Sequence, residues 1–330
     1  MKKIIIIASL LIGSTALSAQ VTDGESALKT VRTDTVDGWK KGGLFNLNFT
    51  QVSLTNWAAG GQNSVSLTGL SSLFANLKRG NFTWDNTLLL AFGQIKQGEG
   101  DFTKSDDRIQ FTSKYGQKAT KNWYYAGLFD FQTQFARGYE DGTDSSPIIS
   151  DFMAPGYFLG AIGMDYKPSS NFTLFISPIT AKLTVVSNDD LARAGSFGVQ
   201  GDEFDAVTGA QTETFENTRL EIGGYLRMMY KREIMKNVNY QTNLGLFSSY
   251  SNNRQNIDVN WDNILSMKVN KYITASITTS LIYDDDIDIT ELKSDGTPRF
   301  QSDGLTPIIG PRTQFKYVLG VGFAYKFGDQ

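Results

Sequence analysis

The sequence contains no cysteine and no histidine among its 330 residues. Without cysteine the chain has no disulfide, no thiolate metal site, no thiol nucleophile and no lipoprotein anchor. Without histidine it lacks the commonest general base, the commonest metal ligand and the serine–histidine mechanism of hydrolases. We therefore expect no catalytic residues, no cofactor, no metal site and no enzymatic activity.

The sequence also has no large excess of charge of either sign and few long apolar runs. Lys and Arg number 31 and Asp and Glu 34, which gives a net charge of −3 and argues against a nucleic-acid partner. Residues 1–19 are typical of a secretory signal peptide, with Lys2 and Lys3 before an apolar run and small residues at its end. That run is too short to span a bilayer, and no later apolar stretch approaches the roughly 18 residues of a spanning helix.

Alternation with period two is the dominant pattern, and residues 315–327 show it best. Odd positions carry Phe, Tyr, Leu or Val, whereas even positions are small or polar apart from Val318. Aromatic residues occupy both ends of the apolar face and aliphatic residues its middle. That order is typical of a strand facing lipid, because aromatic rings settle at the two membrane interfaces.

Similar segments recur along the chain. The predicted strands are 44–54, 65–77, 81–96, 108–116, 123–135, 158–166, 172–186, 219–231, 238–250, 257–269, 273–283 and 315–327. We predict an all-β fold, an antiparallel transmembrane β-barrel of about 12 strands with short periplasmic turns and longer extracellular loops. The expected organisation is a signal peptide (1–19), a periplasmic lead segment (20–43) and the barrel (44–330). A soluble β-sandwich is the alternative, but it predicts strands of about 5–6 residues.

The links between these strands alternate in length. The short ones are rich in Lys and comprise 78–80, 118–122, 167–171, 231–237 and 270–271; the outer ones are 55–64, 97–107, 136–157, 187–218, 251–256 and 284–314. Pro178 cannot donate to a ladder, so we predict a bulge near Ser177 that moves the outward set to Ile179, Ala181 and Leu183. The acidic run 284–288 lacks the glycine and spacing of a calcium loop, so we expect a solvated loop tip.

The faces opposite the apolar stripes should line the lumen. The candidate lumen-lining residues are Arg108, Asp130, Asp165, Lys182, Arg219, Glu221, Arg227, Asp258, Asp262 and Lys316, together with Asp85, Lys114 and Lys326. Both signs are mixed, which favours a paired, structural interior with Arg219, Glu221 and Arg227 as one cluster. The alternative interpretation is a selectivity path for a charged solute.

The stretch 48–64, Asn-Phe-Thr-Gln-Val-Ser-Leu-Thr-Asn-Trp-Ala-Ala-Gly-Gly-Gln-Asn-Ser, resembles the signature of a domain-of-unknown-function family of Bacteroidota outer-membrane proteins. Trp39 with Gly42 and Gly43, and the block 176–184, resemble other recurring blocks of that family. The resemblance implies a β-barrel in the outer membrane of a Gram-negative cell and no established activity. The signature hairpin residues are Asn48, Gln51, Ser53, Asn56, Trp57, Gly60, Gly61 and Asn63. We expect them to form a locally paired turn or, alternatively, a polar lumenal patch or a partner-docking loop.

These observations lead to a functional expectation. The hydrophilic lumen predicts a porin-like passive pore for small solutes in the outer membrane. A non-conducting accessory subunit of a larger outer-membrane assembly is the alternative, and an outer-membrane enzyme is the least favoured class. The expected partners are membrane lipid, a small solute and other outer-membrane proteins.

Overall fold

The structure is a computed structural model that describes residues 37–53, 63–140, 142, 144–169, 171–205, 208–251, 255–270, 273–291, 293, 299–302 and 306–328. The predicted signal peptide and most of the predicted lead segment lie outside these residues. Among the helices described, none has the length and apolar character needed to cross a membrane.

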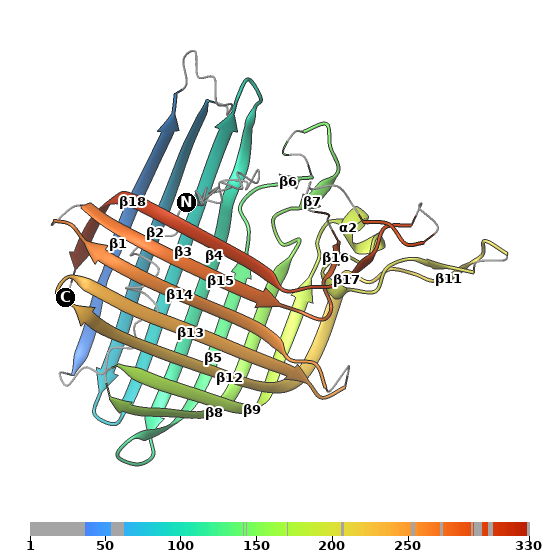
Figure 1. Cartoon of the computed structure of the whole chain (residues 1–330). Coiled ribbons are helices and arrows are strands. Elements are labelled where there is room, and N and C mark those ends of the chain that lie inside the picture. The colour runs from blue at the N-terminus through green and yellow to red at the C-terminus, as the bar shows by residue number, and fades with distance from the viewer. Residues whose placement is uncertain are drawn as a thin grey trace, which may run out of the picture.

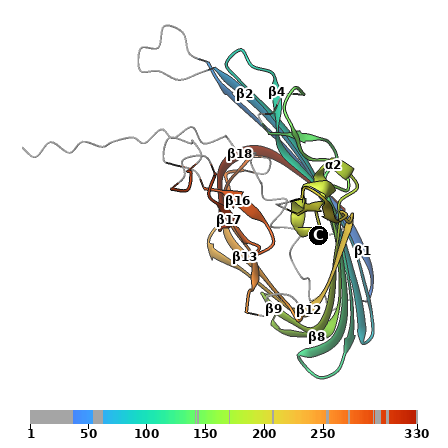
Figure 2. The same cartoon turned by 90° about the vertical axis from the view of Figure 1, so that its right-hand side faces the viewer.

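The strands close one antiparallel barrel, in the spatial order β1-β18-β15-β14-β13-β12-β9-β8-β5-β4-β3-β2 (Figures 1 and 2). The predicted fold class, an antiparallel barrel of twelve strands, is confirmed. The barrel strands are β1 (Gly38–Val52), β2 (Ser64–Arg79), β3 (Phe82–Gln97), β4 (Phe102–Lys118), β5 (Trp123–Thr133), β8 (Gly156–Ser169), β9 (Phe172–Val185), β12 (Thr218–Met235), β13 (Val238–Ser249), β14 (Asp258–Lys268), β15 (Ile273–Tyr283) and β18 (Gln314–Gly328).

The longer links gather at one end of the barrel, on the right of Figure 1, and carry the small elements. These are β6 (Gly138–Tyr139), β7 (Ile148–Ser150), α2 (Asp189–Arg193), η1 (Ser196–Gly198), β10 (Glu203–Phe204), β11 (Gln211–Glu213), β16 (Asp288–Thr290) and β17 (Ile309–Pro311). Buried Val186, Leu191 and Val199 pack there with Ala154 in a small apolar core of the loops.

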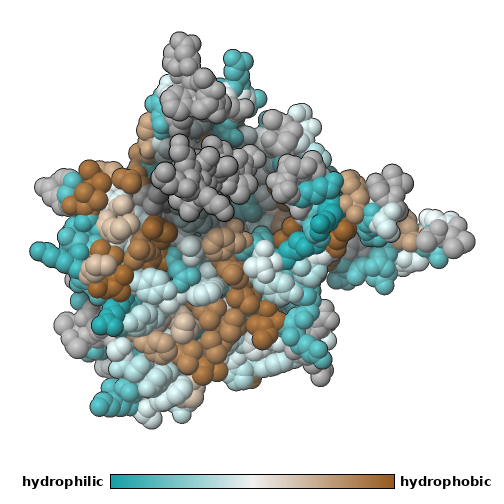
Figure 3. Space-filling view, viewed as in Figure 1, coloured by the Kyte–Doolittle hydropathy of each residue, from teal (hydrophilic) through white to brown (hydrophobic). Residues whose placement is uncertain are grey.

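Sidedness follows the alternation of the sequence. Large apolar side chains such as Phe45, Trp84 and Val321 are exposed on the outside of the barrel, whereas Asn46, Thr180 and Ser276 on the opposite faces are buried. Figure 3 shows hydrophobic residues gathered over the front strands and hydrophilic residues at the loop end. An outer surface of this kind suits a hydrocarbon surrounding.

Polar side chains on the outward faces form hydrogen bonds with side chains of the adjacent strands. The Trp84 indole donates to the Ser113 hydroxyl, which donates to the Asn86 carbonyl, at 2.9 and 2.8 Å. On another part of the wall the Tyr240 hydroxyl donates to Asn263 at 2.8 Å. Because lipid offers no hydrogen bonds, such local pairing lowers the cost of keeping polar atoms on this surface.

The predicted bulge in β9 is present. The pairing of β9 shifts by one residue against both neighbours, between Gly223 and Tyr225 on β12 and between Ile162 and Met164 on β8. As a result, Ile176 and Ile179 are both exposed outside, while Phe175, Ser177 and Thr180 are buried inside. The extra residue therefore keeps both halves of the strand in phase with the barrel wall.

The largest errors in the predicted strand bounds lie at the starts of two strands. β1 begins at Gly38, although residues up to 43 were predicted as lead-in, and β4 begins at Phe102, although 97–107 was predicted as a loop. Each addition holds a single large apolar residue, Trp39 or Phe102, and is otherwise small or polar, so neither has an apolar stripe. Where a strand projects beyond the apolar zone both of its faces can meet water, so the alternation used for prediction disappears.

A carboxylate fastens the loop that carries β16 and β17. Glu291 accepts hydrogen bonds from the guanidinium groups of Arg299 and Arg312, each at 2.6 Å. The hydrogen bond from Arg299 lowers the pKa of Glu291 below its ordinary value of 4.5. The contribution of this contact is therefore complete above pH 4.5 and is lost as the pH falls through the depressed pKa.

We accordingly expect the β16–β17 amides to lose hydrogen-exchange protection below pH 4.5, measured as protection factors so that intrinsic exchange is removed. Glu291→Gln should show reduced protection at every pH and no loss in that window. Unchanged protection of the native chain at low pH would show that the contact does not hold the loop.

Candidate functional site in the charged barrel interior

The inward faces carry two buried ionic clusters, one deep in the wall and one toward the loop end. The first, which we call the inner cluster, consists of Asp165 on β8 with Lys114 on β4 and Lys167 on β8. The lysine ammonium groups lie 2.6 and 3.2 Å from the same oxygen of Asp165, whose side chain is 1% exposed. Asp85 on β3 faces Lys114 in the strand pairing, and Lys167 lies over the Tyr124 ring at 5.1 Å.

The second cluster lies toward the loop end, and we call it the outer cluster. Lys182 on β9 lies 2.9 Å from Asp258, 3.5 Å from Asp284 and 3.5 Å from Glu221. Arg219 on β12 lies 3.3 Å from Glu221 and 2.8 Å from Asp286. Two cations, on β9 and β12, thus meet four carboxylates. The carboxylates belong to β12, to β14 and to the link after β15.

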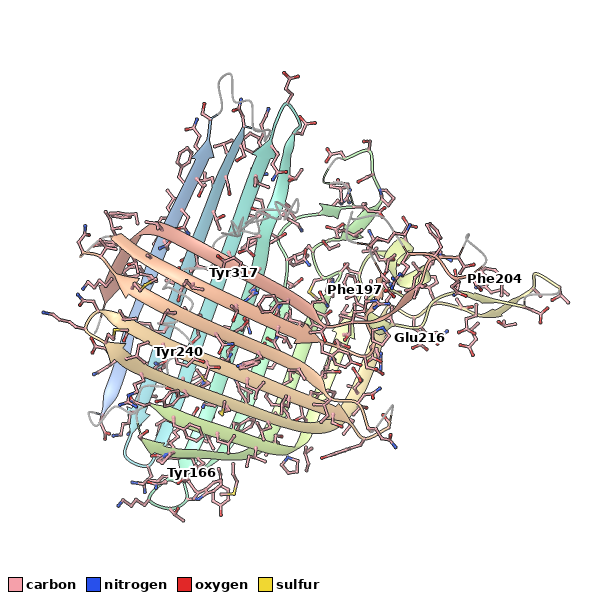
Figure 4. The ribbon with its side chains drawn as sticks, viewed as in Figure 1. Tyr166, Phe197, Phe204, Glu216, Tyr240 and Tyr317 are labelled. Carbon is pink, nitrogen blue, oxygen red and sulfur yellow. The ribbon has the colours of Figure 1, made fainter. Side chains whose placement is uncertain are left out.

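Arg219 also ties a loop to the barrel wall. Its guanidinium donates to the Gly198 carbonyl of η1 at 3.0 Å, while the Asp286 carboxylate belongs to the link between β15 and β18. Figure 4 places Phe197 among the loop side chains close to the barrel end and Phe204 on the hairpin that projects away from it. The outer cluster therefore joins two long loops to the lumenal wall.

The acidic run 284–288 is not the solvated tip that we predicted. Asp284 and Asp286 are partly buried against Lys182 and Arg219, and Asp285 accepts a hydrogen bond from Asn256. The error arises because cations on distant strands determine the burial of this run. Among the described residues, no group of three or more Asp, Glu, Cys or His side chains is arranged to hold a metal ion.

Other predicted lumen-lining residues are more dispersed. Asp130 accepts from the Gln110 amide at 3.2 Å and from the Thr112 hydroxyl at 2.5 Å, and Asp262 accepts from Ser280. Arg227 lies 3.4 Å from the Asn243 side chain and not with Arg219 and Glu221, so the predicted three-residue cluster is wrong in that member. Arg108 lies on β4 and is half-buried; the side chains of Lys316 and Lys326 lie outside the described residues.

The structure reveals contacts that sequence reasoning missed, one on the outward face of β4 and one inside the barrel. Lys104 binds Asp107 at 2.9 Å and the Ala136 carbonyl at 2.8 Å, and thereby fixes the chain leaving β5. Apolar side chains also face the interior, where Leu128, Ala161 and Phe175 form a buried cluster. On each strand these residues alternate with the outward-facing apolar residues. Their position in that alternation is the signal that could have identified them as inward.

The signature hairpin is only partly described. Asn48 is buried, whereas Gln51, Ser53 and Asn63 are exposed and border a pocket of about 220 Å³ with Ser64, Val65, Lys96 and Gly98. Asn56, Trp57, Gly60 and Gly61 lie outside the described residues.

The chain is similar to one family model and to several solved structures. A family model described as "Protein of unknown function (DUF3078)" matches residues 49–139. The COG4313 outer membrane channel from Pseudomonas putida F1 is similar at 11% identity, covering 89% of this chain and 97% of the channel, with a TM-score of 0.39. The translocator domain of autotransporter NalP from Neisseria meningitidis gives 11% identity, 91% coverage of each chain and a TM-score of 0.35. No curated protein matches the chain.

Proposed function

We propose that this chain is an outer-membrane β-barrel, exported by a cleaved signal peptide, that acts as a passive pore for small solutes. The observation that supports it is the sidedness of the wall, with exposed aromatic and aliphatic residues outside and buried amides, hydroxyls and charges inside. The Bacteroidota origin is part of this proposal and rests on the signature stretch 48–64. Stable conductance steps of the purified protein in a planar bilayer are the direct test.

The outer cluster suggests whether the pore selects cations or anions. Lys182 and Arg219 face Glu221, Asp258, Asp284 and Asp286, so the fixed charges at this level sum to a negative value. A ring of excess carboxylates lowers the electrostatic energy of a cation in a narrow aqueous path. We therefore expect the pore to prefer cations over anions.

Replacing both Asp258 and Asp284 with Asn should reduce that preference. Each substitution removes one negative charge and keeps the side-chain shape. The ratio of K⁺ to Cl⁻ permeability is expected to fall roughly fivefold for each carboxylate removed, because unit charges about 4 Å apart in water interact by about 1 kcal/mol. The measurement is the reversal potential under a KCl gradient.

The matched control is Asp189→Asn with Asp190→Asn, since these exposed carboxylates belong to α2 outside the barrel wall. This pair should leave the reversal potential nearly unchanged. Equal shifts in both double variants would assign the preference to the overall surface charge and not to the outer cluster.

A non-conducting accessory subunit of a larger outer-membrane assembly is the second candidate. Leu128, Phe175 and Ile264 occupy the interior with apolar side chains, and Phe204 is 61% exposed on the projecting β10–β11 hairpin. A silent bilayer together with copurifying outer-membrane proteins would favour this role. We propose no catalytic role, because the chain has no histidine to serve as a base.

A further inference from the structure

The wall of the barrel is joined least extensively between its first and last strands. Pairing of β1 with β18 runs only from Gly42 to Leu47, opposite Phe323 to Gly328, and is the shortest between neighbouring barrel strands. Beyond Leu47, β1 follows β2 as far as Val52, while the earlier part of β18 follows β15 from Gln314 onward. Figure 1 shows the two strands separating, with β18 crossing the front and β1 rising behind it.

This ladder is too short to seal a full membrane span. A tilted spanning strand needs about 9–11 residues, so pairing that stops at Leu47 and Phe323 leaves part of the wall without a ladder between β1 and β18. The outward residues on both sides of the gap, Phe49 and Val321, are exposed and apolar. The separation therefore faces the same surroundings as the rest of the apolar outer surface.

The described inward side chains beside the end of this ladder, Asn46 and Asn48, are polar and neutral. Asn46 is 0% exposed, and its amide nitrogen and oxygen form no hydrogen bond with any described residue. Asn48 is buried next to it, and Gly322 of β18 provides the room, because a Cβ there would collide with the Asn48 amide oxygen. The buried Ser72 hydroxyl on β2 is likewise without a hydrogen bond among the described residues.

An amide buried without hydrogen-bond partners is destabilising, which favours a polar guest at Asn46. The nearby interior carries no described ion pair, because the inner cluster lies on β4 and β8 and the outer cluster on β9, β12 and β14. A neutral hydrogen-bonding group thus suits the inside, and an apolar chain suits the outside.

We propose that the divergence of β1 and β18 is a lateral opening through which a neutral amphipathic molecule passes between the barrel interior and the surrounding lipid. Its head group bonds to Asn46 beside Asn48, and its apolar chain leaves between Phe49 and Val321. The inference rests on the membrane location in the proposed function but not on conduction. The two proposals can therefore fail separately. Bilayer recording tests whether the barrel conducts, and labelling in lipid vesicles tests whether the opening exists.

The natural absence of cysteine allows single-site labelling. Bimane is attached to Asn46→Cys on the inner face at the end of the ladder that borders the opening, to Phe49→Cys on the outer rim of the opening and to Gln241→Cys on the buried inner face of β13. The variants are placed in vesicles of phosphatidylcholine brominated in its acyl chains, which quench on contact. We expect most of the fluorescence to be lost at positions 46 and 49 and to be retained at position 241.

Fluorescence at position 46 that matches position 241 would overturn the proposal. Ser72→Cys provides a second probe of the same inner face in case the substitution at Asn46 prevents folding. A polypeptide that cross-links to position 49 while position 46 stays unquenched would show that a partner strand fills the gap, and it would also overturn the lipid route.

Oxidation of paired cysteines gives an independent measurement. Phe45 and Tyr325 face each other in the ladder, so Phe45→Cys with Tyr325→Cys should form a disulfide readily. Phe49→Cys with Val321→Cys would face each other only if the ladder continued past Leu47. We expect a much slower disulfide in this second pair, and equal rates in the two pairs would mean that the wall is closed there.

Discussion

Replacing Asp165 with Asn is expected to lower the free energy of unfolding by about 3–5 kcal/mol. The carboxylate is almost fully buried and one of its oxygens lies 2.6 Å from Lys114 and 3.2 Å from Lys167. The amide keeps the shape of the side chain but leaves two cations inside the wall without their shared counter-charge. The measurement is chemical denaturation of the barrel in detergent micelles, followed by tryptophan fluorescence.

Asp130→Asn is the matched control. The recorded partners of Asp130 are the neutral Gln110 amide and Thr112 hydroxyl, so this substitution should cost about 1 kcal/mol. A variant with Lys114→Met, Asp165→Leu, Lys167→Met and Asp85→Asn should recover stability relative to Asp165→Asn, because it removes Asp85 together with the cations that it faces and leaves no member of the cluster unpaired. Equal losses for Asp165→Asn and Asp130→Asn would contradict the role of the inner cluster.

The strands of this barrel could be predicted because one physical constraint acts at every position along them. Lipid outside and polar groups inside impose period two, and β15 (Ile273–Tyr283) has the bounds that the alternation indicates. The bulge in β9 was predictable for the same reason, since Pro178 interrupts the pattern between Ile176 and Ile179. Each inference used only neighbouring residues.

The partners inside the lumen could not be predicted in this way. Lys182 meets Asp258 across 76 positions of sequence, and Lys114 meets Asp165 across 51. These pairs depend on how far each strand is shifted against the next around the ring, which the alternation of a single strand does not encode. Glu221 could be paired with Arg219 because the two lie two positions apart on one face of β12.

Arg227 shows the limit of the same reasoning. It shares the inward face of β12 with Arg219 and Glu221, which suggested a common cluster, but it lies beside Asn243. Eight positions at about 3.3 Å each separate Arg227 from Arg219 by roughly 26 Å along the strand. Sharing a face therefore does not establish contact, and the lumen is divided into separate charged levels.

Replacing Gly163 with Val is expected to destabilise the barrel by about 3 kcal/mol, at the upper end of the usual cost of overpacking. Gly163 lies on β8 directly against the bulge, and a Cβ there would collide with the backbone carbonyl of Ile176. The bulge cannot retreat freely, because the Ser177 hydroxyl lies 2.9 Å from the Ile162 carbonyl and accepts from Thr180 at 2.9 Å. Denaturation in micelles again provides the measurement.

Gly160→Val is the control on the same strand, because a Cβ at Gly160 meets nothing within 4 Å. A β-branched residue at that open position should be neutral or favourable. Deleting Pro178 removes the extra residue while preserving the alternation on both sides of it, so Gly163→Val combined with this deletion should regain part of the lost stability. If Gly163→Val were as stable as Gly160→Val, the close approach of the bulge to β8 would not constrain the wall.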